Sequence, residues 1–145
     1  MRYIKTILGL LMILFCSSAF SQDTTGTAKS AKIYFIRNTG YNGSALIFHC
    51  FIDTQLVCNL KNKKFSVHNI NEGTHSFTVR AYSKTLGTKD NSISITAQAG
   101  KTYYIKLLPV KAYTFPGSIN LLEISESTAS PTLKSTKEET NCLEQ

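Results

Sequence analysis

Cysteines are the side chains of this sequence with the widest range of chemistry. One of the four, Cys16, lies in the apolar start of the chain, and Cys50, Cys58 and Cys142 lie beyond it. In an oxidising compartment such residues form disulfides, and an odd number leaves at least one thiol free or paired with another chain. Which residues pair depends on the elements that carry them.

The pairing register of two neighbouring segments decides whether Cys50 and Cys58 can be bridged. Both segments alternate apolar with other residues, which predicts strands. A register that pairs Ile52 with Leu56 places the two cysteines opposite each other on one apolar face, whereas a two-residue turn at 53–54 places them on opposite faces. We interpret Cys50 and Cys58 as a candidate disulfide, with two small buried thiols as the alternative.

Histidine and cysteine are common ligands of transition metals, and they must converge on one point. The pattern predicts that 65–69 and 75–81 pair as a hairpin through a short loop, which directs His68 and His75 to opposite faces. His49 lies on another strand, and no His-x-His, His-Glu-x-x-His or Cys-x-x-Cys spacing occurs. We therefore predict no metal site and no cofactor.

Groups that could carry catalysis are sparse. Asp53, Glu72 and Asp90 fall in predicted turns, so no two carboxylates are placed to face each other across a cleft. No Gly-x-Ser-x-Gly elbow occurs, and Cys50 on an apolar strand face lacks the base and the electropositive setting that activate a thiolate. We predict no catalytic residue and a protein that is not an enzyme.

The start of the chain has the pattern of a secretory signal peptide. A basic beginning precedes a charge-free run, 6–22, whose apolar centre at 7–15 is short for a membrane span. Small residues at Ala19 and Ser21 place the cleavage between Ser21 and Gln22. We predict an exported protein of the periplasm or cell surface with no transmembrane span after cleavage, and an uncleaved anchor is the alternative.

A lipid anchor at Cys16 is disfavoured by its neighbour. A lipid-modified cysteine usually follows a small residue, and here the bulky Phe15 precedes it. We therefore expect export without lipidation at this position.

Alternating apolar residues dominate the region 31–124, which predicts strands. Turn residues separate eight expected strands, at 33–36, 46–52, 56–60, 65–69, 75–81, 93–97, 103–107 and 119–121. Short strands at this spacing predict an all-β fold, an antiparallel β-sandwich of about 7–8 strands. The segment 22–30 is expected to be a flexible leader. The segment 125–145, with two leucines and no aromatic residue, is expected to be a disordered tail.

The chain carries a formal net charge of +7, which favours an anionic partner. Three lysines share one predicted turn, and several tyrosines fall in turns or on outward strand positions. These residues form our candidate binding surface, namely Tyr41, Tyr82, Tyr104, Tyr113, Lys61, Lys63 and Lys64. For the lysines we prefer the simpler interpretation, a solubilising surface with lysines that protect edge strands, to attraction of an anionic partner. Nucleic acid is not expected as a partner of an exported chain.

Three stretches carry a resemblance to known domains, through their order and spacing. They are 32–37 with 43–45, 51–57 with 72–79, and 99–105. Together they resemble the bacterial domain-of-unknown-function family 2846, which consists of small exported β domains that are often lipoproteins. The middle stretch is also similar to PEGA-type β-sandwich modules. The resemblance covers 32–124 and implies an envelope location and a transthyretin-like sandwich, without catalytic residues. The sequence departs from the family pattern at Thr54, where glycine is usual, and at Phe15.

These observations favour a non-catalytic binding or interaction domain of the cell envelope, with an envelope polymer or envelope protein as partner. One alternative is a structural component that self-associates through a free Cys142 on a flexible tail. The other is a small enzyme of unrecognised type, which would place His49 or His75 beside an acid in a deep polar pocket.

Overall fold

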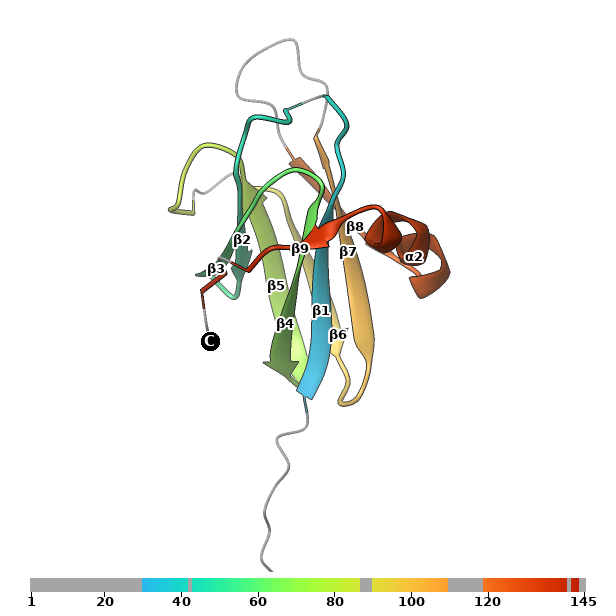
Figure 1. Cartoon of the computed structure of the whole chain (residues 1–145). Coiled ribbons are helices and arrows are strands. Elements are labelled where there is room, and N and C mark those ends of the chain that lie inside the picture. Colours follow the sequence, from blue (N-terminus) through green and yellow to red (C-terminus); the bar gives the residue numbers. More distant parts are fainter. Residues whose placement is uncertain (1–29, 42, 87–89, 110–118, 141, 144–145) are drawn as a thin grey trace, which may run out of the picture.

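Two β-sheets packed face to face form the body of the protein in the computed structural model (Figure 1). The structure describes residues 30–41, 43–86, 90–109, 119–140 and 142–143, so the predicted signal peptide, the leader up to residue 29, and Tyr113 lie outside the described residues. The five-stranded sheet has the order β8-β7-β1-β4-β9, formed by Ile119–Ile124, Thr102–Pro109, Ser30–Arg37, Lys64–Asn71 and Lys137–Glu138. The four-stranded sheet has the order β3-β2-β5-β6, formed by Gln55–Leu60, Phe48–Ile52, Gly73–Arg80 and Ser92–Ala97.

The predicted sandwich is confirmed, and each of the eight expected segments overlaps one of the strands β1 to β8. The sequence predicted antiparallel pairing throughout, and this prediction is wrong for two pairs of strands. The strands β1 and β7 pair in parallel in the middle of their sheet, and β4 pairs in parallel with the short β9. Alternation reveals that a segment is a strand, but it is the same for both directions of pairing.

The predicted hairpin between residues 65–69 and 75–81 is wrong. Only Glu72 separates β4 from β5, yet β4 pairs with β1 and β5 pairs with β2, so the chain changes sheets at this point. Gly73, the first residue of β5, lies at this change of sheets with a φ of +138°, a backbone conformation that favours glycine. The alternation of Phe65 and Val67 predicted that they face the core, but they lie on the outer face of the sheet.

The core between the sheets consists of the inward-facing residues of both layers, almost all of them fully buried. Phe35 of β1 and Phe77 of β5 meet across the two sheets with ring centroids 6.0 Å apart and near-perpendicular planes. Such edge-to-face contacts are favoured between aromatic rings. The alternating residues of the strands therefore give each sheet one apolar face, as the sequence predicted.

The hairpin of β2 and β3 has both the two-residue turn and the facing cysteines, which the sequence predicted as alternatives. Ile52 pairs with Gln55 through a two-residue turn, and Cys50 still pairs with Cys58. A bulge between Cys50 and Phe51 makes this possible, since one extra residue restores the facing of the side chains. Thr54 sits in this turn at a φ of +74°, a conformation that costs a β-branched residue about 1–3 kcal/mol.

The expectation of a disordered tail is wrong for the C-terminal strap, which we define as residues 125–140 and 142–143. Ser125 caps the helix α2 (Glu126–Lys134) by accepting a hydrogen bond from the Thr128 amide. The helix packs on the outer face of the five-stranded sheet and buries Ala129 completely (Figure 1). Backbone hydrogen bonds and a disulfide hold the remainder, so few apolar side chains suffice to order it.

Among the described residues, no helix is long or apolar enough to cross a membrane.

Candidate functional site

The C-terminal strap closes one open edge of the sandwich, where β4 of one sheet faces β3 of the other. The amide of Glu139 donates to the Phe65 carbonyl at 2.8 Å, and the amide of Leu143 donates to the Val57 carbonyl at 2.9 Å. The strap thus runs from β4 to β3. It connects the two sheets by backbone hydrogen bonds on both sides.

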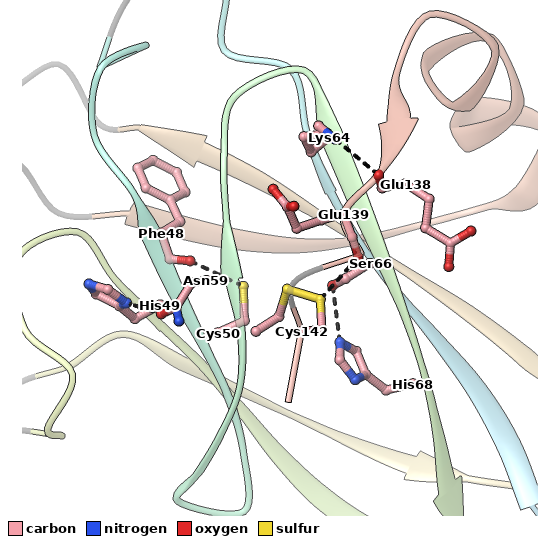
Figure 2. Close-up of a disulfide and its surroundings, with 11 residues drawn as sticks. Phe48, His49, Cys50, Asn59, Lys64, Ser66, His68, Glu138, Glu139 and Cys142 are labelled. Carbon is pink, nitrogen blue, oxygen red and sulfur yellow. Dashed lines mark hydrogen bonds between the residues drawn. A yellow bond between two sulfur atoms is a disulfide. The ribbon is translucent and has the colours of Figure 1, made fainter. Parts of the chain in front are cut away.

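A disulfide between Cys58 and Cys142 fastens the strap to β3 (Figure 2). The predicted Cys50–Cys58 bridge is therefore wrong, although the register that placed these two residues opposite each other is confirmed. Cys142 reaches the same position from the other side as an isolated antiparallel partner of Cys58. The bond also removes the predicted free thiol at Cys142, on which self-association by crosslinking depended.

Cys50 remains a free thiol in the core. Its sulfur lies 3.9 Å from the Phe48 carbonyl, to which it donates a weak hydrogen bond. Burial raises the pKa of Cys50 strongly, and the nearby Arg37 offsets only part of that rise. The thiol is therefore protonated at neutral pH and does not act as a nucleophile in the folded protein.

His68 faces the interior between the sheets, beside the disulfide (Figure 2). Its Nε2 lies 3.0 Å from the Ser66 hydroxyl, and its ring meets Phe35 edge to face at 5.9 Å. Burial lowers the pKa of His68 to about 4, so the imidazole is neutral at physiological pH.

Acid should destabilise the protein through His68. The unfolded chain binds a proton near the ordinary value of 6.5, whereas the folded protein binds it only near pH 4, so the free energy of unfolding falls between these limits as the pH is lowered. The loss is expected to reach about 3 kcal/mol. Urea denaturation of the wild type and of His68→Gln at several pH values measures it, and the variant should lose most of the slope between pH 6.5 and 4. An equal slope in both proteins would contradict this prediction.

An open pocket of about 550 Å³ lies along the strap. Its lining includes His68 and Asn69 of β4, and Glu139 and Cys142 of the strap. Glu139 is 5% exposed, and its Oε2 atom has no hydrogen-bond partner among the described residues. The pocket therefore combines a carboxylate, an imidazole and one residue of the disulfide, Cys142, a combination that residue spacing in the sequence did not predict.

Arg37 at the end of β1 organises a different part of the molecule. Its guanidinium is 0% exposed, lies 3.6 Å above the centre of the Phe48 ring, and donates to the carbonyls of Gly43, Leu46 and Leu60 at 2.8 Å each. Burial lowers the pKa of Arg37 to about 10, and Cys50 acts in the opposite sense. The residue thus holds Gly43 and Leu46, which follow β1, against the end of β3.

The loops that follow β1, β3 and β5 lie at one end of the sandwich, which we call the loop end (Figure 1). Tyr41 is 99% exposed there and Tyr82 is 48% exposed, and Lys61 and Lys63 are also exposed. Lys64 belongs to the same end, but its ammonium group donates to the Glu138 carbonyl of the strap at 3.1 Å. The structure therefore brings together most of the candidate binding surface.

Tyr104 does not belong to the loop end. It lies on the outer face of the five-stranded sheet, where its ring centroid is 5.1 Å from that of Tyr34, and Tyr34 stacks on Phe65 at 6.0 Å. Burial raises the pKa of Tyr104, and nearby Glu126 and Tyr34 add to the rise. This row of aromatic residues flanks α2, so its role is to pack the strap against the sheet.

His75 and Asp53 form an ion pair at the end of the sandwich opposite the loop end. The other ring nitrogen, Nε2, lies 3.0 Å from the Asn71 carbonyl, so both nitrogens face acceptors. Although burial acts in the opposite sense, hydrogen bonds from the Ser76 amide and from His75 hold the pKa of Asp53 below its usual value. The pair ties the β2–β3 turn to β5 and leaves no ring nitrogen to serve as a general base.

His49 is the third histidine, and its Nδ1 lies 2.6 Å from the Asn59 side chain on the neighbouring strand. No carboxylate of the described residues shares this contact. The arrangement is a cross-strand polar pair on the four-stranded sheet.

These features define a β-sandwich whose edge is closed by a disulfide-linked strap and whose loops form a basic, tyrosine-bearing end. The chain belongs to a family described as proteins of unknown function, DUF2846, whose model matches residues 27–116. The match spans β1 to β7, so β8 and the strap with Cys142 lie beyond it. No curated protein and no solved structure matches the chain.

Proposed function

We propose that the protein is exported to the cell envelope, by cleavage between Ser21 and Gln22, and that its sandwich is a non-catalytic interaction domain. Its partner is an anionic envelope polymer, a glycan rich in carboxylate or phosphate, which binds at the loop end. A disulfide within the fold supports export, because such bonds persist in oxidising compartments.

The observation that carries this proposal is that the backbone next to the exposed Tyr41 is bonded to the lysine-bearing turn 61–63. The Asn62 side chain accepts a hydrogen bond from the Thr39 amide at 3.1 Å and donates one to the Gly40 carbonyl at 2.8 Å. Two loops that are distant in the sequence therefore form one surface. An exposed aromatic ring next to ammonium groups suits a polyanionic sugar chain, since the ring packs on the sugar and the lysines pair with the acid groups.

A non-catalytic role agrees with the state of the reactive side chains in the described part of the chain. The Cys50 thiol is buried and protonated, and both nitrogens of His75 are engaged. Activation of either group would require a rearrangement of the strands that hold it.

Co-sedimentation of the purified protein with cell-wall sacculi that carry anionic glycans tests the proposal. The triple variant Tyr41→Ser, Lys61→Gln, Lys63→Asn should bind about tenfold more weakly or worse, because each lysine near an anionic surface contributes about 1 kcal/mol. Asparagine is chosen at position 63 because the backbone there has a φ of +56°.

Lys32→Gln with Lys101→Gln is the matched control, since these exposed lysines lie at the opposite end of the sandwich. The control variant should bind as the wild type does. Equal binding by the triple variant and the wild type would show that the loop end is not the binding surface. Binding to phosphatidylglycerol vesicles but not to sacculi would replace the glycan by a membrane surface.

A further inference from the structure

Three soft or borderline metal ligands meet where the C-terminal strap crosses the edge of the sandwich. The two sulfurs of Cys58 and Cys142 and a ring nitrogen of His68 all lie within 4.8 Å of one another. They come from β3, from the strap and from β4, so the folded chain brings together residues that have no ligand spacing in the sequence.

The three side chains lie close enough together for one cation, although the two sulfurs are bonded to each other. Tetrahedral zinc with Zn–S bonds of about 2.3 Å and Zn–N bonds of about 2.0 Å requires ligand atoms about 3.5–3.8 Å apart. The bond between the sulfurs must therefore be broken before both sulfurs can bind the same cation. Figure 2 shows the imidazole directed at the Ser66 hydroxyl and the sulfur pair, so the ring is already oriented.

We propose that Cys58, His68 and Cys142 form a binding site for a thiophilic d10 cation, Zn²⁺, when the disulfide is reduced. Reduction adds two electrons and two protons to the sulfur pair and gives two thiols. A phosphine becomes its oxide with oxygen and both protons taken from water, whereas a dithiol gives up its own two protons and becomes a disulfide. Each thiol releases its proton as it binds the cation. The oxidised protein holds the strap by a covalent bond, and the reduced protein holds it by the metal.

The pocket along the strap supplies the way in and the remaining coordination position. His68 and Cys142 both belong to its lining, so a cation can enter from solvent and keep a water molecule as its fourth ligand. The His68 Nε2 atom, which faces the sulfur pair, contacts the Ser66 hydroxyl at 3.0 Å and would exchange this contact for the cation (Figure 2).

The experiment is a titration of the purified protein with Zn²⁺, and with Co²⁺ as a spectroscopic probe, before and after reduction by a phosphine. The reduced wild type should bind one equivalent of either metal, show sulfur-to-cobalt charge-transfer bands and melt at a higher temperature with zinc than without it. His68→Gln should bind zinc at least about tenfold more weakly, since even the outer partners of zinc ligands contribute 10–100-fold. Cys142→Ser should lose the charge-transfer bands of a two-thiolate site.

His75→Gln is the matched control, because this histidine lies outside the cluster and pairs with Asp53. It should bind zinc as the reduced wild type does. The reduced protein without metal is either folded or unfolded. In both cases the proposal is wrong if zinc leaves its melting curve and its circular dichroism unchanged. It is equally wrong if His68→Gln binds zinc as tightly as the wild type, or if the oxidised protein gives the same cobalt spectrum.

Discussion

Cys142→Ser is expected to lower the free energy of unfolding by about 4 kcal/mol. The disulfide joins residues 84 positions apart, and a crosslink over a loop of this length removes much of the freedom of the unfolded chain. The variant should also release the end of the strap, because the Cys58–Cys142 bond and the Leu143 hydrogen bond fasten it to β3. Urea denaturation monitored by circular dichroism measures the difference, and a thiol count of the variant shows that Cys50 and Cys58 remain reduced.

A reducing agent provides the control for this prediction. The wild type should move toward the midpoint of the variant when a metal-free phosphine is added with a chelator, whereas Cys142→Ser should keep its midpoint. If the variant and the oxidised wild type unfold at the same urea concentration, the strap does not contribute to stability through this bond.

Arg37→Met is expected to cost about 3 kcal/mol or more. The substitution keeps most of the side-chain volume, but it leaves the carbonyls of Gly43, Leu46 and Leu60 without the guanidinium to which they are bonded. An unpaired buried carbonyl costs about 1–3 kcal/mol, and the stacking on the Phe48 ring is lost as well. Thermal and urea unfolding give the magnitude, and faster amide hydrogen exchange in the described part of 38–47 would locate it.

Arg80→Met serves as the matched control for Arg37→Met. Arg80 pairs with Asp90 at 3.1 Å near the surface, and pairs of this kind contribute about 1 kcal/mol or less. A loss at Arg80 as large as that at Arg37 would show that the burial of the Arg37 guanidinium is not the source of the effect.

The sequence was sufficient to predict the strands and the class of fold, because alternating residues such as Ile33 and Phe35 are a local signal. It was not sufficient to predict how the strands pair. Phe65 and Val67 alternate as core residues do, but an outer face covered in part by α2 is also apolar. The change of sheets at Glu72 therefore had no signature in the pattern.

The strap was missed for a related physical reason. Its composition offers little burial, and composition is what distinguishes ordered from disordered segments in a sequence. Its order comes from partners that only the fold supplies, namely the backbone groups of Phe65 and Val57 and the sulfur of Cys58. The same limit applies to His68, whose two sulfur neighbours at the edge come from β3 and from the strap.

The exposure of the residues in the candidate binding surface was easier to predict than the edge cluster. Lysines and tyrosines in turn-forming segments are usually exposed, and Tyr41, Tyr82, Lys61 and Lys63 are exposed in the structure. Tyr104 is not fully exposed, because it lies on a strand whose outer face is partly covered.

The free Cys50 thiol gives the order of chain synthesis a chemical consequence. Cys50 is the partner of Cys58 across the β2–β3 hairpin, and the two are separated by few residues, whereas Cys142 follows 84 residues after Cys58. An oxidant that reaches the chain before Cys142 has been made would therefore meet only Cys50 and Cys58 in this part of the fold. A bond between these two would have to be exchanged for the Cys58–Cys142 bond before the protein reached the structure described.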